Sequence, residues 1–167
     1  SANLSTGIGL LVIEAAILAQ NNKTAAEISV AVENLKPYVR ASFVVDTLTY
    51  LHRGGRCNAI AAMAGGLLKL HPQIIVEHGA MKPTKKYRGK MDSVILSYVK
   101  DMEPALKHAR PDRVFITHSG CDPTIVNAVR SYLEGLGIFH EILETRAGGV
   151  ISSHCGPGTL GVLFIES

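Results

Sequence analysis

The last fifty or so residues most strongly constrain the fold, because strand-like and helix-like segments alternate along them. Residues 113–117 are rich in β-branched and aromatic side chains and predict a strand. Asp122 is then placed to cap a helix over 123–135, and a second strand is predicted over 138–144. This order predicts a βαβ unit with two parallel strands and places the chain in the α/β class. A last strand over 160–165 is expected as an edge or return strand of the same sheet.

Upstream of this unit, the sequence predicts helices that flank a sheet. Residues 7–20 are apolar on almost every face, which predicts a helix that is buried on most sides. Thr24 followed by Glu27 forms a capping box that opens a second helix. The spacing of apolar residues over 92–108 predicts a third helix, and Pro104 is expected to kink it or mark its last turn.

The segment between these helices predicts short strands and a hairpin. Residues 42–45 and 74–76 read as strands, and a short helix is expected around 48–51. A turn at His78 and Gly79 leads to a second short strand, which we expect to end before the basic run 82–90. That run is typical of a solvated hairpin end, or of a docking surface for an acidic or phosphate-bearing partner.

The composition favours an apolar pocket over a nucleic-acid platform. Hydrophobic residues make up 47% of the 167 residues, but aromatics only 5%, with no Trp. The net charge of +3 is too small to indicate a nucleic-acid partner. The three cysteines form no CxxC pair, which favours a reducing, cytoplasmic location. No signal peptide is recognisable, and the longest apolar run, 8–19, is too short to span a bilayer.

The turn His118-Ser119-Gly120-Cys121-Asp122 follows a predicted strand and carries several reactive groups. Its amides at a helix N-terminus suit an anion, although the Asp122 carboxylate already competes for them. Ser119 lacks the first glycine of the G-x-S-x-G pattern that positions a nucleophilic serine. Cys121 is either a thiol activated by the helix terminus or a small buried hydrophobe. A tight strand-to-helix turn explains the same residues without any ligand.

Two His and two Cys are present in this turn and in His154-Cys155, which is enough for a tetrahedral zinc. Their spacing argues against it, because adjacent residues such as His154 and Cys155 rarely ligate one ion. We therefore expect no metal.

His154 is the residue we single out for ligand binding. It precedes Gly156-Pro157-Gly158, a stiff turn, and the Thr159 hydroxyl follows. An imidazole beside a hydroxyl suits a carboxylate ligand. A histidine that only satisfies backbone carbonyls in a turn fits the pattern equally well.

Three segments resemble the C-terminal part of the DegV family of bacterial fatty-acid-binding proteins. They are FVVDTLTYLHRGGR at 43–56, FITHSGCDP at 115–123 and ETRAGGVISSHCGPGT at 144–159. The resemblance implies a mixed sheet with a βαβ unit and flanking helices, from which an N-terminal α/β segment is missing. Residues of about 1–40 would be helices that pack against that segment, and residues of about 41–167 would form the lipid-binding domain.

The resemblance also implies the function. The protein would bind a long-chain fatty acid in a buried apolar tunnel and present its carboxylate to a fatty acid kinase, as a carrier rather than an enzyme. His154 would hold the carboxylate, with Thr159 close by, beside a Thr and a Ser of the missing segment. Arg88 and Lys86 would contact the kinase. The expected tunnel residues are apolar: Phe43, Leu48, Leu51, Ile60, Met63, Leu67 and Phe164.

Two other functions are kept open. One is a small hydrolase or phosphatase that uses His118, Ser119, Cys121 or His154. The other is an interaction module whose glycines serve tight turns only, which predicts no bound small molecule. Apart from the fatty acid, no cofactor is expected, and neither nucleic acid nor a membrane span is expected.

Overall fold

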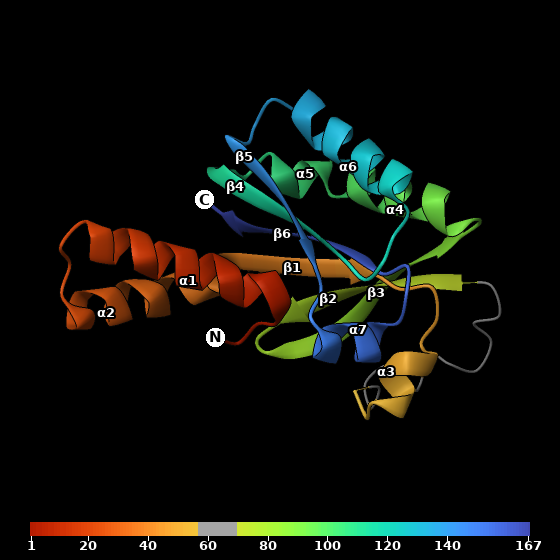
Figure 1. The fold of residues 1–167 in the computed structure, drawn as a ribbon, viewed down its shortest axis with the longest axis horizontal. Coiled ribbons are helices and arrows are strands. Elements are labelled where there is room, and N and C mark those ends of the chain that lie inside the picture. The colour runs from red at the N-terminus through yellow and green to blue at the C-terminus, as the bar shows by residue number, and fades with distance from the viewer. Residues whose placement is uncertain (57–69) are drawn as a thin grey trace.

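A computed structural model describes residues 1–56 and 70–167 as one sheet with helices on both faces (Figure 1). The elements follow one another as α1 (Ser5–Gln20), α2 (Ala25–Leu35), η1 (Lys36–Tyr38), β1 (Val39–Val44), α3 (Thr49–Arg53), β2 (Leu70–Glu77), β3 (Ala80–Arg88), α4 (Met91–Asp101), α5 (Glu103–Leu106), β4 (Ala109–His118), α6 (Pro123–Gly135), β5 (Glu141–Arg146), α7 (Gly149–Cys155) and β6 (Leu160–Glu166).

The described strands pair in the order β3-β2-β1-β6-β4-β5. β4 and β5 are parallel and joined through α6, which confirms the predicted βαβ unit. The other neighbouring strands are antiparallel, so the sheet is mixed. Asp122 caps α6 by accepting a hydrogen bond from the Thr124 amide at 2.8 Å, as its position in the sequence predicts.

The last strand was expected to be either an edge strand or a return strand of the sheet, and the edge position is wrong. β6 lies in the middle of the sheet, between β1 and β4, and its residues 160–165 are all buried. A strand with both faces covered needs apolar residues at successive positions, and this strand carries them. Gly161 allows the neighbouring strand to come close, because a Cβ there would lie 2.7 Å from the Ser42 carbonyl oxygen.

One face of the sheet carries the larger hydrophobic core. Helices α4, α5 and α6 cover it (Figure 1). Tyr98 is fully buried there, and its hydroxyl donates to the Ser42 carbonyl at 2.8 Å and accepts from the Val162 amide at 3.0 Å. The buried Tyr98 hydroxyl therefore has partners within the fold both as a donor and as an acceptor.

The opposite face carries two smaller hydrophobic clusters. The first lies under α1, where Leu10 and Leu11 pack on Val39, Phe115 and Leu163. The second, which we call the α3–α7 cluster, has as its buried members Phe43, Val45, Leu51, Ile74 and Cys155. Leu4, Leu48, Val76, Met81 and Ile151 pack against it. This face is thus divided where the first is continuous.

Three local expectations differ from the structure. The helix expected over 92–108 ends at Asp101 and restarts at Glu103, where Pro104 occupies the first turn of α5. The basic residues expected after the hairpin lie mostly within β3. A helix, α7, forms over residues 149–155, where only a glycine-rich segment was expected. Within the described ranges, every helix is too short or too polar to cross a bilayer.

Candidate ligand-binding site

The polar residues singled out in the sequence meet at one end of the sheet. β4 and β5 both end there, so His118 lies opposite Arg146, and His118 also lies opposite Leu160 at the start of β6. β1 ends at the same place, where Val44 faces Leu160. The carboxyl ends of parallel strands are where α/β sheets most often bind ligands.

α3 and α7 pack against each other at this end, below the sheet in Figure 1. The imidazole of His154 lies directly on Gly54, since a Cβ built at Gly54 would be 1.9 Å from His154 Nδ1. The ring of Tyr50 lies on Gly156 in the same way, with 2.3 Å between its Cδ2 and a Cβ built there. At the C-terminus of each helix, therefore, a glycine packs against an aromatic or imidazole ring of the other helix.

His154 has hydrogen-bonding capacity that the rest of the described chain does not use. Its Nδ1 is buried and has no hydrogen-bond partner, and Nε2 makes no bond to residues 1–56 or 70–167. A buried polar atom without a partner is unusual in a folded protein and calls for an explanation. The interpretation that His154 only satisfies turn carbonyls is not what the structure shows, whereas a ring that offers Nε2 to a ligand agrees with it.

Thr159 lies close to this ring in sequence but serves the local fold. Its hydroxyl is buried and donates to the Cys155 carbonyl at 3.0 Å, which stabilises the turn after α7. That proton is therefore engaged and is not free for a carboxylate. The Thr159 carbonyl accepts from the Ser119 amide at 2.8 Å and joins the two turns.

Three of the expected tunnel residues come together in the α3–α7 cluster: Phe43, Leu48 and Leu51. Phe164 does not, because it lies on the opposite face of the sheet with α4 and α6. The expectations for Ile60, Met63 and Leu67 fall outside the described residues.

Sequence reasoning missed seven members of this apolar site: Leu4, Val45, Ile74, Val76, Met81, Ile151 and Cys155. Alternation along β2 points to Ile74, because Ile74 and Val76 fall on one face. Ile151 and Cys155 are spaced by four residues, so they share a face of α7 once that helix is known. Cys155 belongs to the same helix as His154, which joins the apolar cluster directly to the imidazole.

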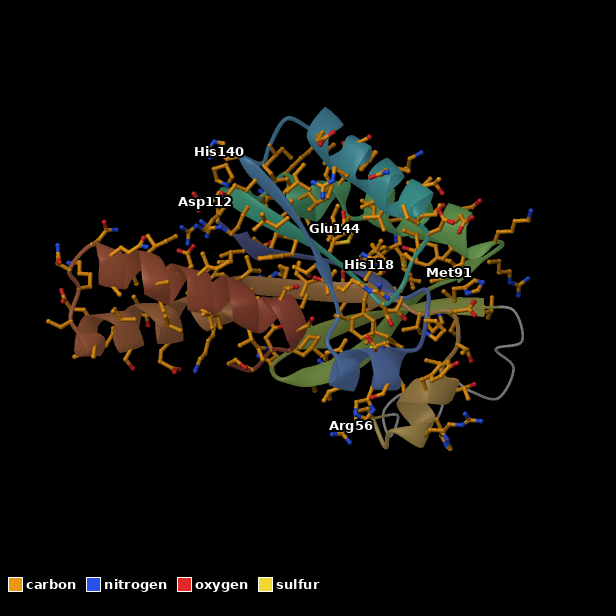
Figure 2. All side chains as sticks on the ribbon, viewed as in Figure 1. Arg56, Met91, Asp112, His118, His140 and Glu144 are labelled. Atoms are coloured by element: carbon orange, nitrogen blue, oxygen red, sulfur yellow. The ribbon has the colours of Figure 1, made fainter. Side chains whose placement is uncertain are left out.

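In the His118 turn, the imidazole has hydrogen-bond partners within the fold. His118 Nδ1 accepts from the Cys121 amide at 3.2 Å, so Nε2 carries the proton, and Nε2 faces Glu144 Oε1 at 3.4 Å (Figure 2). Both ring nitrogens are therefore engaged, which leaves no base for Ser119. The thiol of Cys121 is inert rather than activated, because burial, and then the nearby Asp92, raises the pKa of Cys121 to about 11.

The structure also separates the residues of the considered zinc site. Cys121 packs against the core under α4 and α6, whereas Cys155 belongs to the α3–α7 cluster on the other face. Among the residues that the structure describes, no three His, Cys, Asp or Glu side chains converge as metal ligands. The first turn of α6 is also closed to an anion, because the Asp122 carboxylate accepts from Thr124.

Unpaired positive charge gathers at the same end of the sheet. In the described part of the chain, seven Lys and Arg side chains have no carboxylate partner. One is Lys100, and the others are Arg53, Arg56, Lys86, Arg88, Lys90 and Arg146. Apart from Lys100, these residues lie at the end of α3 and just after it, at the end of β3 and just after it, and at the end of β5.

The two predicted docking residues belong to this group. Lys85 and Tyr87 of β3 contact Asp101 of α4. Because side chains alternate along a strand, Lys86 and Arg88 point to the other face, on the side of α3 and α7. Both are exposed.

A groove of about 710 Å³ lies elsewhere, against β1, β2, η1 and α5. Phe164 is the one expected tunnel residue that lines it, and His154 does not. Cations at its rim are paired, Arg40 with Glu166 and Lys85 with Asp101 at 3.0 Å. The cations at the rim of this groove are therefore neutralised by carboxylates.

Comparison with known proteins identifies relatives along the whole chain. Residues 1–167 match a family model described as an uncharacterised protein of the DegV family. A DegV domain-containing protein of Caldanaerobacter subterraneus is 30% identical over 168 residues, which cover 99% of this chain and 59% of that protein. The chain thus spans somewhat more than half the length of this relative.

Solved structures share the fold. A fatty-acid-binding DegV family protein from Thermus thermophilus superposes with a TM-score of 0.87 at 28% identity, over 99% of this chain and 59% of that one. The B3 protein of the Streptococcus pneumoniae fatty acid kinase, loaded with linoleic acid, has a TM-score of 0.81 at 15% identity, over 96% of this chain and 56% of that one. At that identity the second similarity shows the fold alone.

Proposed function

The chain belongs to the DegV family, and we propose that it binds a long-chain fatty acid, with the acyl chain against the α3–α7 cluster and the carboxylate at His154. The observation that carries this proposal is the juxtaposition of an unsatisfied imidazole with an apolar cluster on the same helix. A fatty acid has this pair of features, a single anionic head on an apolar chain.

The apolar cluster supplies the larger part of the binding energy in this proposal. Each buried methylene contributes roughly 0.8 kcal/mol, so acyl chains of more than about ten carbons outweigh the entropy lost on binding. Phe43, Leu51 and Ile74 pack together as buried aliphatic and aromatic side chains without a charged group among them. Chain length therefore controls affinity more strongly than the head group does.

The head group selects an acid over other lipids. Because His154 Nδ1 is buried without an acceptor, the tautomer that fits best carries its proton on Nε2, which then donates to a carboxylate oxygen. One donor satisfies only part of a carboxylate. We propose that the other donors are the Thr and the Ser that the family resemblance implies, in the portion of the relatives that this chain does not span.

We propose further that the bound carboxylate is presented to a fatty acid kinase, which performs the phosphoryl transfer. The unpaired cations Arg88 and Lys86 face the side of the sheet on which His154 lies, where they suit the phosphates of a nucleotide or an acyl phosphate. The chain itself acts as a carrier in this proposal, since the ring nitrogens of His118 are engaged and the thiol pKa values of Cys121 and Cys155 are raised to about 11.

Fatty acid binding is tested with a series of saturated acids from octanoate to hexadecanoate, titrated by calorimetry into the full-length protein. Affinity should rise about tenfold with each added pair of methylenes. His154→Ala should weaken every acid by about tenfold, because a hydrogen bond to a charged group is lost. His140→Ala is the matched control, since His140 is exposed and lies at the other end of β5 from the site (Figure 2). Affinity that does not depend on chain length would contradict the proposal.

The kinase step is tested separately with a fatty acid kinase and ATP. Arg88→Ala should lower the rate of acyl phosphate formation by about tenfold while the fatty acid affinity stays unchanged. Lys23→Ala is the control, because Lys23 is a surface cation paired with Glu27 beyond α1. An unchanged rate for Arg88→Ala would remove Arg88 from the docking surface and leave the fatty acid site intact.

A further inference from the structure

We propose that Gly54 is the positioning residue for His154: its missing side chain forms the notch in α3 that holds the imidazole in the orientation that binds a carboxylate. The inference rests on the proposed role of His154 and adds to it the residue that fixes the ring. Gly54 touches no ligand in this proposal and acts only through the imidazole.

The contact between the two residues is too close for any other amino acid. A Cβ on Gly54 would lie 1.9 Å from His154 Nδ1 and 2.5 Å from Cε1, far inside van der Waals contact. The ring thus lies against the end of α3 with Nδ1 nearest to Gly54, where Nδ1 is buried. Burying Nδ1 in an apolar notch leaves Nε2 as the only nitrogen that can reach a ligand.

The backbone of Gly54 does not explain why glycine is there. Its φ of −78° and ψ of 0° are ordinary helical values that alanine adopts without strain. Gly55, the next residue, differs in both respects: its φ is +69°, which favours glycine, and a Cβ there would meet nothing within 4 Å. Gly54 is therefore explained by the imidazole, and Gly55 by the backbone turn that ends α3.

The reciprocal contact holds the notch in place. Tyr50, one helical turn before Gly54, covers Gly156 after the C-terminus of α7. Gly156 has a φ of +83° and also lacks room for a Cβ. With His154 on Gly54 and Tyr50 on Gly156, the two helices cannot slide past each other without moving the imidazole.

Two neighbouring substitutions provide the test, with hexadecanoate and hexadecanol as paired probes in the full-length protein. Gly54→Ala pushes the ring out of the notch, and the side chain can rotate away, so the fold is retained. We expect Gly54→Ala to reduce the preference for the acid over the alcohol by about tenfold and to leave hexadecanol affinity unchanged. Gly55→Ala strains the backbone but does not touch His154, so the preference should stay at the wild-type value.

A second readout follows the ring itself without a ligand. The ¹⁵N resonances of the His154 imidazole should show the Nε2–H tautomer in the wild type and in Gly55→Ala, and both ring nitrogens should shift in Gly54→Ala. In a His154→Ala background, adding Gly54→Ala should change the acid preference no further.

Unchanged ring resonances together with an unchanged preference in Gly54→Ala would overturn the positioning role. So would an additional loss of preference in the His154→Ala background. If the wild type does not prefer the acid at all, the proposed function fails, and the ring resonances still decide whether Gly54 positions the imidazole.

Discussion

The two faces of the sheet differ in how continuous their hydrophobic cores are. Under α4, α5 and α6 the hydrophobic core is continuous, and its central tyrosine has hydrogen-bond partners for both roles of its hydroxyl. The opposite face is split into two smaller clusters, and it leaves His154 Nδ1 unsatisfied. It also leaves apolar side chains in solvent, with Val12 of α1 60% exposed and Val150 of α7 71% exposed.

This difference assigns separate tasks to the two faces. A continuous, closely packed core mainly stabilises the fold. Unused hydrogen-bonding capacity and exposed apolar surface are the features that a binding site requires. Stability should therefore depend mainly on the α4–α6 face, and ligand binding on the α3–α7 cluster.

The largest expected effect comes from a pair of leucines that are both fully buried, Leu133 of α6 and Leu51 of α3. Leu133→Ala should lower the free energy of unfolding by about 3–5 kcal/mol, because the packed core cannot collapse around the cavity. Leu51→Ala should cost about 2 kcal/mol, since α3 is a five-residue helix that can move inward. Urea unfolding followed by circular dichroism measures both, and equal losses would break the comparison between the faces.

A smaller effect is expected from Tyr98→Phe on the stable face. Loss of the hydroxyl leaves the buried Val162 amide without its acceptor and should cost about 1–3 kcal/mol in the free energy of unfolding. The same urea experiment measures it. A cost below about 0.5 kcal/mol would show that the amide finds another partner.

The ionisation of Tyr98 gives the same substitution a pH signature. Burial raises the pKa of Tyr98 above its ordinary value of 10.0, so the folded protein keeps the phenol neutral after the unfolded chain has begun to ionise. The contribution of neutral Tyr98 is complete below about pH 10 and is lost as the pH rises from there towards the folded pKa. Wild-type stability should fall more steeply than that of Tyr98→Phe across this window.

Cysteine labelling compares the two faces in the presence of ligand. Burial raises the pKa of Cys155 to about 11, and Cys121 has the same value, so both thiols should react slowly near pH 8, where roughly one in a thousand is ionised. A bound fatty acid should slow the labelling of Cys155 further and leave Cys121 unchanged. Peptide mapping by mass spectrometry after iodoacetamide treatment distinguishes the sites. Protection of Cys121 alone would place the ligand on the wrong face.

The smallest effect is expected at α2, which has no buried residue. Its capping box holds the pKa of Glu27 down to about 2, chiefly through the backbone and side-chain hydrogen bonds of Thr24. A lowered carboxyl pKa stabilises the folded state above the unfolded pKa, near 4.5, and that contribution disappears as the pH falls through about 2. Amide exchange should therefore show local fraying of α2 in acid. Thr24→Ala should reduce this acid dependence, because it removes the side-chain hydrogen bond to Glu27 but keeps the one from the backbone amide, and it should leave α6 unaffected.

Much of the fold follows from local sequence signals. The capping box of α2 and the Asp122 cap of α6 are local contacts between neighbouring residues, so the sequence predicts them well. The parallel unit β4-α6-β5 follows from the alternation of apolar segments. The mixed sheet with flanking helices was predicted from the family resemblance and is confirmed.

Features set by tertiary contact were harder to predict. The central position of β6 depends on its pairing with two distant strands. The sequence signal for that position is the apolar run 160–165, because a strand buried on both faces needs apolar residues at successive positions. α7 contains Gly149 and β-branched residues that favour other structures, and its packing on α3 overrides that preference. Likewise, His154 was recognised from its motif, but the notch at Gly54 is visible only where two distant segments meet.

The most direct test of the proposed function is organic extraction of the purified, denatured full-length protein, followed by negative-ion mass spectrometry. We predict a long-chain fatty acid in near-stoichiometric amount, and less of it from the His154→Ala protein than from the His140→Ala control. A full-length protein that carries no fatty acid, and that takes up none when hexadecanoate is supplied, would contradict the account.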